Sequence, residues 1–171
     1  MRRAALAALG SRVSRVLVVT GAHASEVEAA LAGLAVELVR CTDWAGGLAA
    51  SLRVGVAAAL AQGEASVLVM LADQPAVDAA LLDALIERSA AGAELVACEY
   101  GGEPGVPAVF APHVARELLA LEGDRGAKAL LLRERARLAL VPFPNGTLDV
   151  DTREDWERAR RILGARASEL P

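Results

Sequence analysis

Asp73 is the first residue whose position suggests chemistry. The stretch SVLVMLADQP begins with an almost entirely apolar run, and the carboxylate follows directly after it. Burying a carboxylate there costs free energy unless a partner shares its site. A divalent metal ion is one such partner, because hard cations bind carboxylate oxygens together with a ligand's phosphates. The alternative is a turn or N-cap residue before a helix that begins at Asp78, and the pattern leaves both interpretations open.

Two more carboxylates lie near the end of the chain, in the stretch LDVDTREDW. Asp149 and Asp151 alternate with apolar residues, so an extended backbone would place them on one face. Carboxylates that lie so close repel each other, and a bound cation would relieve the repulsion. Alternatively, Asp151 and Thr152 begin a helix with an acidic first turn, which the helix dipole favours. That alternative leaves Asp149 unexplained.

A third candidate is the stretch LEGDRGAKAL, in which two glycines enclose Asp124 and Arg125. Backbone N–H groups at the start of the following helix could bind an anion, although an ordinary connection between helices has the same composition. His23 and His113 are isolated and are expected at the surface. The sequence contains no CxxC, HExxH, GxGxxG or P-loop motif, so zinc, dinucleotide and Walker-type sites have no support.

The elements that must position these residues alternate between strand and helix. The predicted strands are 16–21, 36–41, 66–71, 94–102, 106–112, 138–143 and, as a strand or extended segment, 148–152. The predicted helices are one before residue 16, then 23–34 with Ser25 and Glu28 at capping-box spacing, 48–63, 78–91, 114–121, 127–135 and 153–165 with Thr152 as its cap. This alternation predicts an α/β fold with a mostly parallel sheet covered on both faces. Ligands bind such sheets at the carboxyl ends of the strands.

Composition limits the classes of function. A chain of 171 residues favours one domain, and 54% apolar with only 3% aromatic residues implies a core of Ala, Leu and Val. A net charge of −4 gives no basic field for nucleic acid. No run reaches the ~20 apolar residues of a membrane helix, so we expect no membrane partner and a cytoplasmic location. Cys41 and Cys98 are expected to be buried hydrophobic residues in a reducing compartment.

Five segments together resemble a known family. DWAGGLAASLRVGV, VLVMLADQPAV, PGVPAVF, LLALEGDRGAKALL and DVDTREDW occur in the order seen in MobA-like NTP transferases, and the molybdopterin cytidylyltransferase branch is the most similar. The resemblance covers nearly the whole chain. It implies a three-layer, Rossmann-like, doubly wound fold of the nucleotide-diphospho-sugar transferase type. It also implies transfer of a nucleotidyl group from an NTP with release of pyrophosphate, using Mg²⁺.

The resemblance also assigns roles to residues of this chain. Asp73 and Asp151 match the catalytic acids that bind the metal, with Asp149 as a third ligand. The nucleotide-binding positions that it implies are Gly47, Ser51, Asp73 and Gln74. Those on the acceptor side are Pro107 and Asp124. Because metal-assisted attack on a phosphate requires little covalent chemistry from the protein, the isolated histidines are no objection to this assignment.

One departure from the family concerns the start of the chain. The family begins with a strand and a Gly-rich loop, LAAGxSxRMG, which binds the phosphates of the NTP, and neither occurs before VLVVTG here. We therefore expect residues 1–171 to form a single domain that is truncated at its N-terminus and lacks the first strand. That strand would lie between 16–21 and 66–71. Without it, these two strands must close up, leave a groove or borrow a strand from a partner, and an open edge favours association.

Two functions follow as hypotheses. The first is a Mg²⁺-dependent nucleotidyltransferase that moves a nucleotidyl group, CMP ahead of GMP, from an NTP to a molybdopterin-type acceptor. Without the phosphate-binding loop, we expect little or no activity from this chain. The second is a non-catalytic accessory protein that binds a nucleotide or cofactor during molybdoenzyme maturation. The implied partners are CTP ahead of GTP, a molybdopterin-type molecule, a molybdoenzyme and a second copy of the chain.

Overall fold

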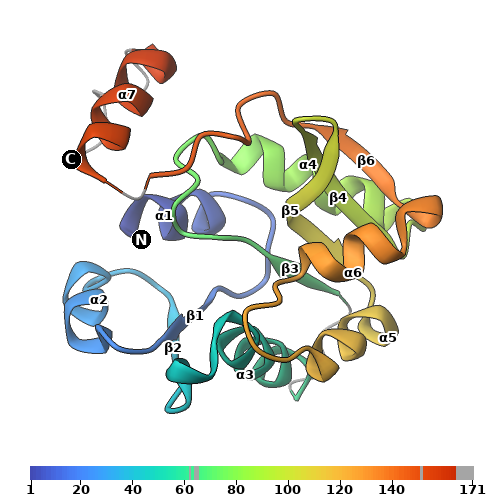
Figure 1. Cartoon of the computed structure of the whole chain (residues 1–171), viewed down its shortest axis with the longest axis horizontal. Coiled ribbons are helices and arrows are strands. Elements are labelled where there is room, and N and C mark those ends of the chain that lie inside the picture. The colour runs from blue at the N-terminus through green and yellow to red at the C-terminus, as the bar shows by residue number, and fades with distance from the viewer. Residues whose placement is uncertain (62, 64–65, 151, 165–171) are drawn as a thin grey trace.

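The computed structural model describes residues 1–61, 63, 66–150 and 152–164 (Figure 1). The helices are α1 (Arg2–Leu9), α2 (Ala24–Ala30), α3 (Leu48–Leu60), α4 (Ala79–Ala90), α5 (Pro112–Ala115), α6 (Lys128–Arg133) and α7 (Arg153–Leu163), with 3₁₀ turns η1 (Trp44–Gly46), η2 (Arg116–Ala120) and η3 (Arg135–Arg137). The strands are β1 (Leu17–Thr20), β2 (Glu37–Arg40), β3 (Val67–Val69), β4 (Leu95–Tyr100), β5 (Glu103–Phe110) and β6 (Ala139–Pro142). None of the helices in these described ranges is long and apolar enough to cross a membrane.

The strands form two sheets. One contains β1 and β2, which are parallel, and the other has the order β3-β5-β4-β6. The predicted α/β class is confirmed, and the larger sheet is mixed, because β5 runs antiparallel to both β3 and β4 while β4 and β6 are parallel. The antiparallel pairing of β4 with β5 arises from a tight hairpin at Gly101 and Gly102. Both glycines have positive φ, as a two-residue hairpin turn requires.

Helices cover both faces of the larger sheet, as the apolar strands predicted. Alternate residues of β4 point to opposite faces: Leu95 packs in a cluster with Phe110 and residues of α3 and α6, while Val96 packs in a second cluster with Leu82 and Leu85 of α4. All five side chains are fully buried. The two clusters make the sheet the middle layer of three.

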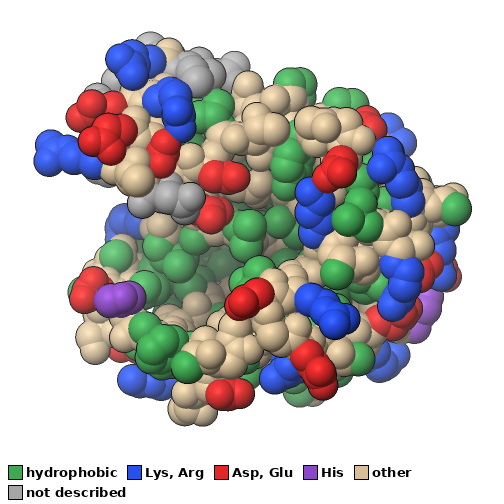
Figure 2. All heavy atoms as spheres, in the orientation of Figure 1, with side chains coloured by type: hydrophobic (Ala, Val, Ile, Leu, Met, Phe, Trp, Pro, Cys, Tyr) green, Lys and Arg blue, Asp and Glu red, His purple; other side chains and the backbone are tan. Residues whose placement is uncertain are grey.

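Strands β1 and β3 do not pair, since they belong to separate sheets. The smaller sheet packs in a cluster of its own, formed by Ala5, Val18 and Leu31. On its other side Val19 contacts α3, where a Cβ on Gly55 would lie 2.8 Å from Val19 Cγ2. Figure 2 shows a hollow lined largely by hydrophobic side chains between the surfaces that α2 and α7 form. Of the three outcomes expected for the two strands, closure into one sheet is therefore excluded.

Local expectations have mixed outcomes. The cap of the last helix is confirmed, because the Thr152 hydroxyl accepts from Asp155 N in a complete capping box. The capping box at Ser25 and Glu28 is wrong: α2 begins after His23, so Ser25 lies inside the helix and no side chain caps it. The helix predicted at 114–121 is divided between α5 and η2, and 148–150 form no strand. Cys41 and Cys98 are free and buried, as expected.

Candidate active site

Asp73 lies just after β3, where the chain turns toward α4. Its Oδ1 atom is buried and has no hydrogen-bond partner within the described part of the chain. The N-cap of α4 is Asp78 instead, whose Oδ1 accepts from Leu81 N at 2.9 Å. The interpretation of Asp73 as a helix cap is therefore wrong. A buried carboxylate oxygen without a partner is costly, which points to a ligand that supplies one.

The segment that carries the other predicted metal acids lies directly against Asp73. Val150 N donates to the backbone carbonyl of Asp73 at 2.9 Å, although 77 positions separate the two in the sequence. Asp151 is outside the described residues, so only its neighbours can be placed. Asp149 precedes Val150, and its carboxylate is near enough to the Tyr100 hydroxyl to help raise the pKa of that hydroxyl. The fold therefore brings the two acidic stretches together at the end of β3.

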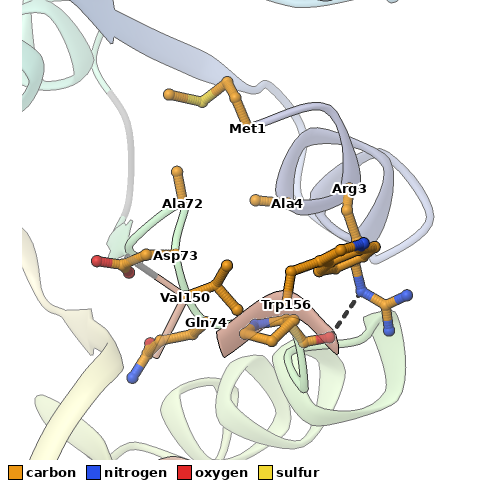
Figure 3. Close-up of a pocket in the computed structure, with 9 residues that line it drawn as sticks. Met1, Arg3, Ala4, Ala72, Asp73, Gln74, Val150 and Trp156 are labelled. Carbon is orange, nitrogen blue, oxygen red and sulfur yellow. Dashed lines mark hydrogen bonds between the residues drawn. The ribbon is translucent and has the colours of Figure 1, made fainter. Parts of the chain in front are cut away.

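A cavity of about 160 Å³ lies beside these residues. It is lined by residues of α1, of the turn after β3 and of the segment around α7, namely Met1, Arg3, Ala4, Ala72, Asp73, Gln74, Pro75, Val150 and Trp156. Figure 3 shows the Asp73 carboxylate directed away from Arg3, whose Nε donates to the Pro75 carbonyl at 2.6 Å. The acid is therefore not neutralised by that arginine.

The donor atoms at Asp73 fit a hard divalent cation. The free atom is a carboxylate oxygen, the ligand type that Mg²⁺ and Mn²⁺ prefer. In the described ranges, no group of three or more His, Cys, Asp or Glu side chains could hold a metal alone. A cation at this site would need Asp73, further oxygens from the 149–151 segment, water and the oxygens of a ligand. Such a partly open shell is usual for magnesium sites that bind substrate phosphates.

Gly47, Ser51 and Asp124 form a second group at the start of α3. Gly47 has a φ of +91°, and a Cβ there would lie 2.5 Å from the Gly123 carbonyl oxygen and 2.7 Å from Asp124 Oδ1. Ala49 N donates to the same carbonyl at 3.0 Å. The structure thus joins the predicted nucleotide-binding Gly47 to the predicted acceptor-side Asp124. Ser51 lies half-buried one turn into α3, and none of the three lines the Asp73 cavity.

Pro107 and Gln74 are buried, so neither side chain is open to a ligand at the surface. Pro107 is fully buried within β5 and follows a cis peptide bond from Val106. Gln74 is 4% exposed, and its Nε2 donates to Tyr100 OH at 3.3 Å and to the Gly146 carbonyl at 3.2 Å. Both residues therefore serve at least in part to hold the strand ends in place.

Tyr100 is a residue at this site that the sequence did not reveal. Its hydroxyl donates to the Val106 carbonyl at 3.0 Å, and its ring meets Phe143 edge to face at 5.8 Å between centroids. Burial raises its pKa, the hydrogen bond from Gln74 opposes the shift, and Asp149 adds to it. Tyr100 is the single tyrosine of the chain, and it precedes a Gly-Gly turn. Neither feature marks a site, because only the register of β4 brings it to Gln74.

Comparison with known proteins identifies the class. A family model described as the MobA-like NTP transferase domain matches residues 1–138, so the chain belongs to that family. Among solved structures, Rv0371c of Mycobacterium tuberculosis H37Rv in complex with manganese is 32% identical and covers 92% of this chain and 85% of its own, with a TM-score of 0.72. A nucleotidyl transferase from Methanothermobacter thermautotrophicus is 29% identical and covers 95% and 80%, with a TM-score of 0.77.

A more distant structure shares the fold alone. Molybdopterin-guanine dinucleotide biosynthesis protein A from Archaeoglobus fulgidus is 22% identical and covers 90% of this chain and 79% of its own, with a TM-score of 0.58. A search of curated proteins found no significant match. The Rossmann-like α/β architecture expected from the sequence is thus confirmed.

Proposed function

We propose that the protein is a divalent-metal-dependent nucleotidyltransferase that moves CMP from CTP to a molybdopterin-type acceptor and releases pyrophosphate. The observation that carries this proposal is the buried Asp73 Oδ1, which has no hydrogen-bond partner among the described residues and lies at the carboxyl end of a strand. Membership of the MobA-like family and the manganese complex of Rv0371c support it.

In this proposal the metal is Mg²⁺, held by Asp73 and Asp151 with Asp149 as a third ligand. Bound there, the cation would neutralise the phosphates of the NTP and orient them for displacement. The protein's own part is positional. The hydrogen bond between Val150 N and the Asp73 carbonyl fixes the spacing of the two acidic segments before any ligand binds.

The remaining candidate residues bind the two substrates. Gly47 and Ser51, at the start of α3, contact the nucleotide together with Asp73 and Gln74. Asp124 lies on the acceptor side, as does the part of β5 that contains the buried Pro107. Gly47 cannot be enlarged without displacing the Gly123 carbonyl, so the backbone there is fixed by packing. Preference for CTP and for a molybdopterin-type acceptor rests on the family resemblance.

A second candidate function is a non-catalytic accessory protein that binds a nucleotide or cofactor for a molybdoenzyme. The observation that favours it is that, among the described residues, no group of three or more His, Cys, Asp or Glu side chains could hold a metal ion by itself. Incubation with CTP, Mg²⁺ and molybdopterin separates the candidates. Release of pyrophosphate that Asp73→Asn abolishes would exclude the accessory role, and no release above background would exclude the transferase role.

The metal site is tested by titrating the protein with Mn²⁺ in a calorimeter and by electron paramagnetic resonance of the bound ion. The wild type is expected to bind Mn²⁺, and Asp73→Asn to bind it at least tenfold more weakly. Asp78→Asn is the matched control, because it removes the same charge five positions away and Asn caps a helix as well as Asp does. Equal binding by wild type and Asp73→Asn, or loss in both variants, would refute the proposed site.

A further inference from the structure

The side-chain amide of Gln74 is held in one orientation. Both hydrogens of its NH₂ group are used, one toward Tyr100 OH and one toward the Gly146 carbonyl. A carbonyl oxygen only accepts hydrogen bonds, so rotating the amide by 180° would place two acceptors against each other. The Tyr100 hydroxyl donates its own hydrogen to the Val106 carbonyl and can only accept from Gln74. The environment therefore excludes the flipped amide.

This orientation leaves the other end of the amide without a partner. Gln74 Oε1 is buried and makes no hydrogen bond within the described part of the chain, and Gln74 lines the same cavity as Asp73. Two adjacent residues thus each bury an acceptor oxygen that has no hydrogen-bond partner among the described residues. Buried acceptors are normally satisfied, so both call for a hydrogen-bond donor or a cation.

Tyr100 is itself fixed from several sides. A Cβ on Gly146 would collide with the Tyr100 ring, and a Cβ on Gly105 would collide with its hydroxyl, so the two backbones pack directly on the side chain. The ring contact with Phe143 fixes it from a third direction. The hydroxyl that meets Gln74 therefore has little freedom to move, and a rigid partner keeps the amide rigid.

We propose that Tyr100 is a positioning residue that locks the Gln74 amide, so that Gln74 Oε1 accepts a hydrogen bond from a water molecule bound to the divalent cation at Asp73. This inference rests on the proposed metal site and adds a role for Gln74 and Tyr100 within it. It also changes the role of Gln74: the NH₂ group is occupied, so Gln74 cannot donate to a phosphate. Oxygen acceptors commonly orient the water ligands of a hydrated cation.

The test compares Tyr100→Phe with wild type in Mn²⁺ titrations. This variant removes only the hydroxyl and keeps the ring. We expect a three- to tenfold loss of Mn²⁺ affinity. Ser11→Ala is the matched control, because Ser11 Oγ donates to the Ala8 carbonyl at 2.7 Å and the substitution deletes the same kind of bond in the α1–β1 connection. Both variants should lower Tm slightly, but Ser11→Ala should leave the Mn²⁺ affinity unchanged.

A double-mutant cycle shows whether Tyr100 acts through Gln74. Gln74→Met removes the amide and keeps the length of the side chain. If Tyr100 acts by holding the Gln74 amide in one orientation, adding Tyr100→Phe to Gln74→Met causes no further loss of Mn²⁺ affinity. Additive losses, or a Tyr100→Phe variant with wild-type affinity, would overturn the inference while leaving the Asp73 site intact.

The amide itself supplies a readout that needs no metal. In the wild type, the two Gln74 side-chain N–H signals should be resolved by NMR and exchange slowly with solvent, and in Tyr100→Phe one of them should exchange faster. A wild type that fails to bind Mn²⁺ would overturn the proposed function and the acceptor role together. Rapid solvent exchange of the Gln74 side-chain N–H hydrogens in the wild type would overturn only the role of Tyr100 in fixing the amide.

Discussion

The two sheets of the molecule differ in how deeply their side chains are buried. In the larger sheet the first four residues of β4 are buried, and helices cover both faces. In the smaller sheet β2 is mostly exposed, with Leu38 at 45%, and three buried side chains form its separate cluster. Because hydrophobic burial is the main favourable term in folding, the larger sheet is the stable scaffold. Tyr100 ends β4 of that scaffold, and Asp73 and Gln74 lie in the segment that follows its strand β3, whereas β1–β2 depends on the helices around it.

The largest expected effect on the free energy of unfolding comes from creating a cavity in each hydrophobic cluster in turn. Leu85→Ala should cost about 3 kcal/mol, since it leaves a cavity among fully buried neighbours. Leu31→Ala should cost about 2 kcal/mol, because the smaller cluster can relax around the gap. Urea unfolding measures both losses, and native-state hydrogen exchange locates them. Leu31→Ala should lower protection in β1 and β2 alone, and an equal loss in β4 and β5 would contradict the division into two regions.

A smaller effect is expected where α3 joins the two regions. Gly55→Ala gains about 1 kcal/mol of helix propensity, but its Cβ would lie 2.8 Å from Val19 Cγ2 and must push β1 away. We expect a net loss of about 1 kcal/mol in the wild type, and a net gain of similar size in a Val19→Ala background. Thermal unfolding of the four proteins measures the cycle. The same change in both backgrounds would show that the contact does not hold β1 against α3.

The smallest effect is electrostatic and confined to the smaller sheet. Arg15, just before β1, forms a bidentate ion pair with Glu37 of β2, with N–O distances of 2.8 and 2.6 Å. The hydrogen bond from Arg15 lowers the pKa of Glu37 below its ordinary value of 4.5. A lowered pKa stabilises the folded state above pH 4.5, and this contribution is lost as the pH falls further. Exchange protection of β1 and β2 should therefore fall below pH 4.5, whereas in Glu37→Gln it should change less.

The candidate site was only partly visible in the sequence. Asp73 was found because an acid after a buried apolar run is unusual, and that signal is local. The approach of the second acidic stretch to Asp73 was implied only by the family resemblance, since no local pattern joins positions so far apart. The hydrogen bond from Val150 N to the Asp73 carbonyl was not predicted. Tyr100 was missed entirely, because its partners Gln74, Val106 and Gly146 come from three other segments. The capping box at Ser25 failed because spacing alone does not decide where a helix begins.

The sequence by itself determined the alternation of strands and helices, the apolar strands of the larger sheet and the cap at Thr152. These properties depend on neighbours within a few positions, where backbone propensity and periodicity act. The tertiary structure alone decided that β1 and β3 do not pair, that Gly47 packs against Gly123 and Asp124, and that the Gln74 amide donates to Tyr100. Such contacts depend on how helices and strands distant in sequence pack in space, which no local pattern specifies.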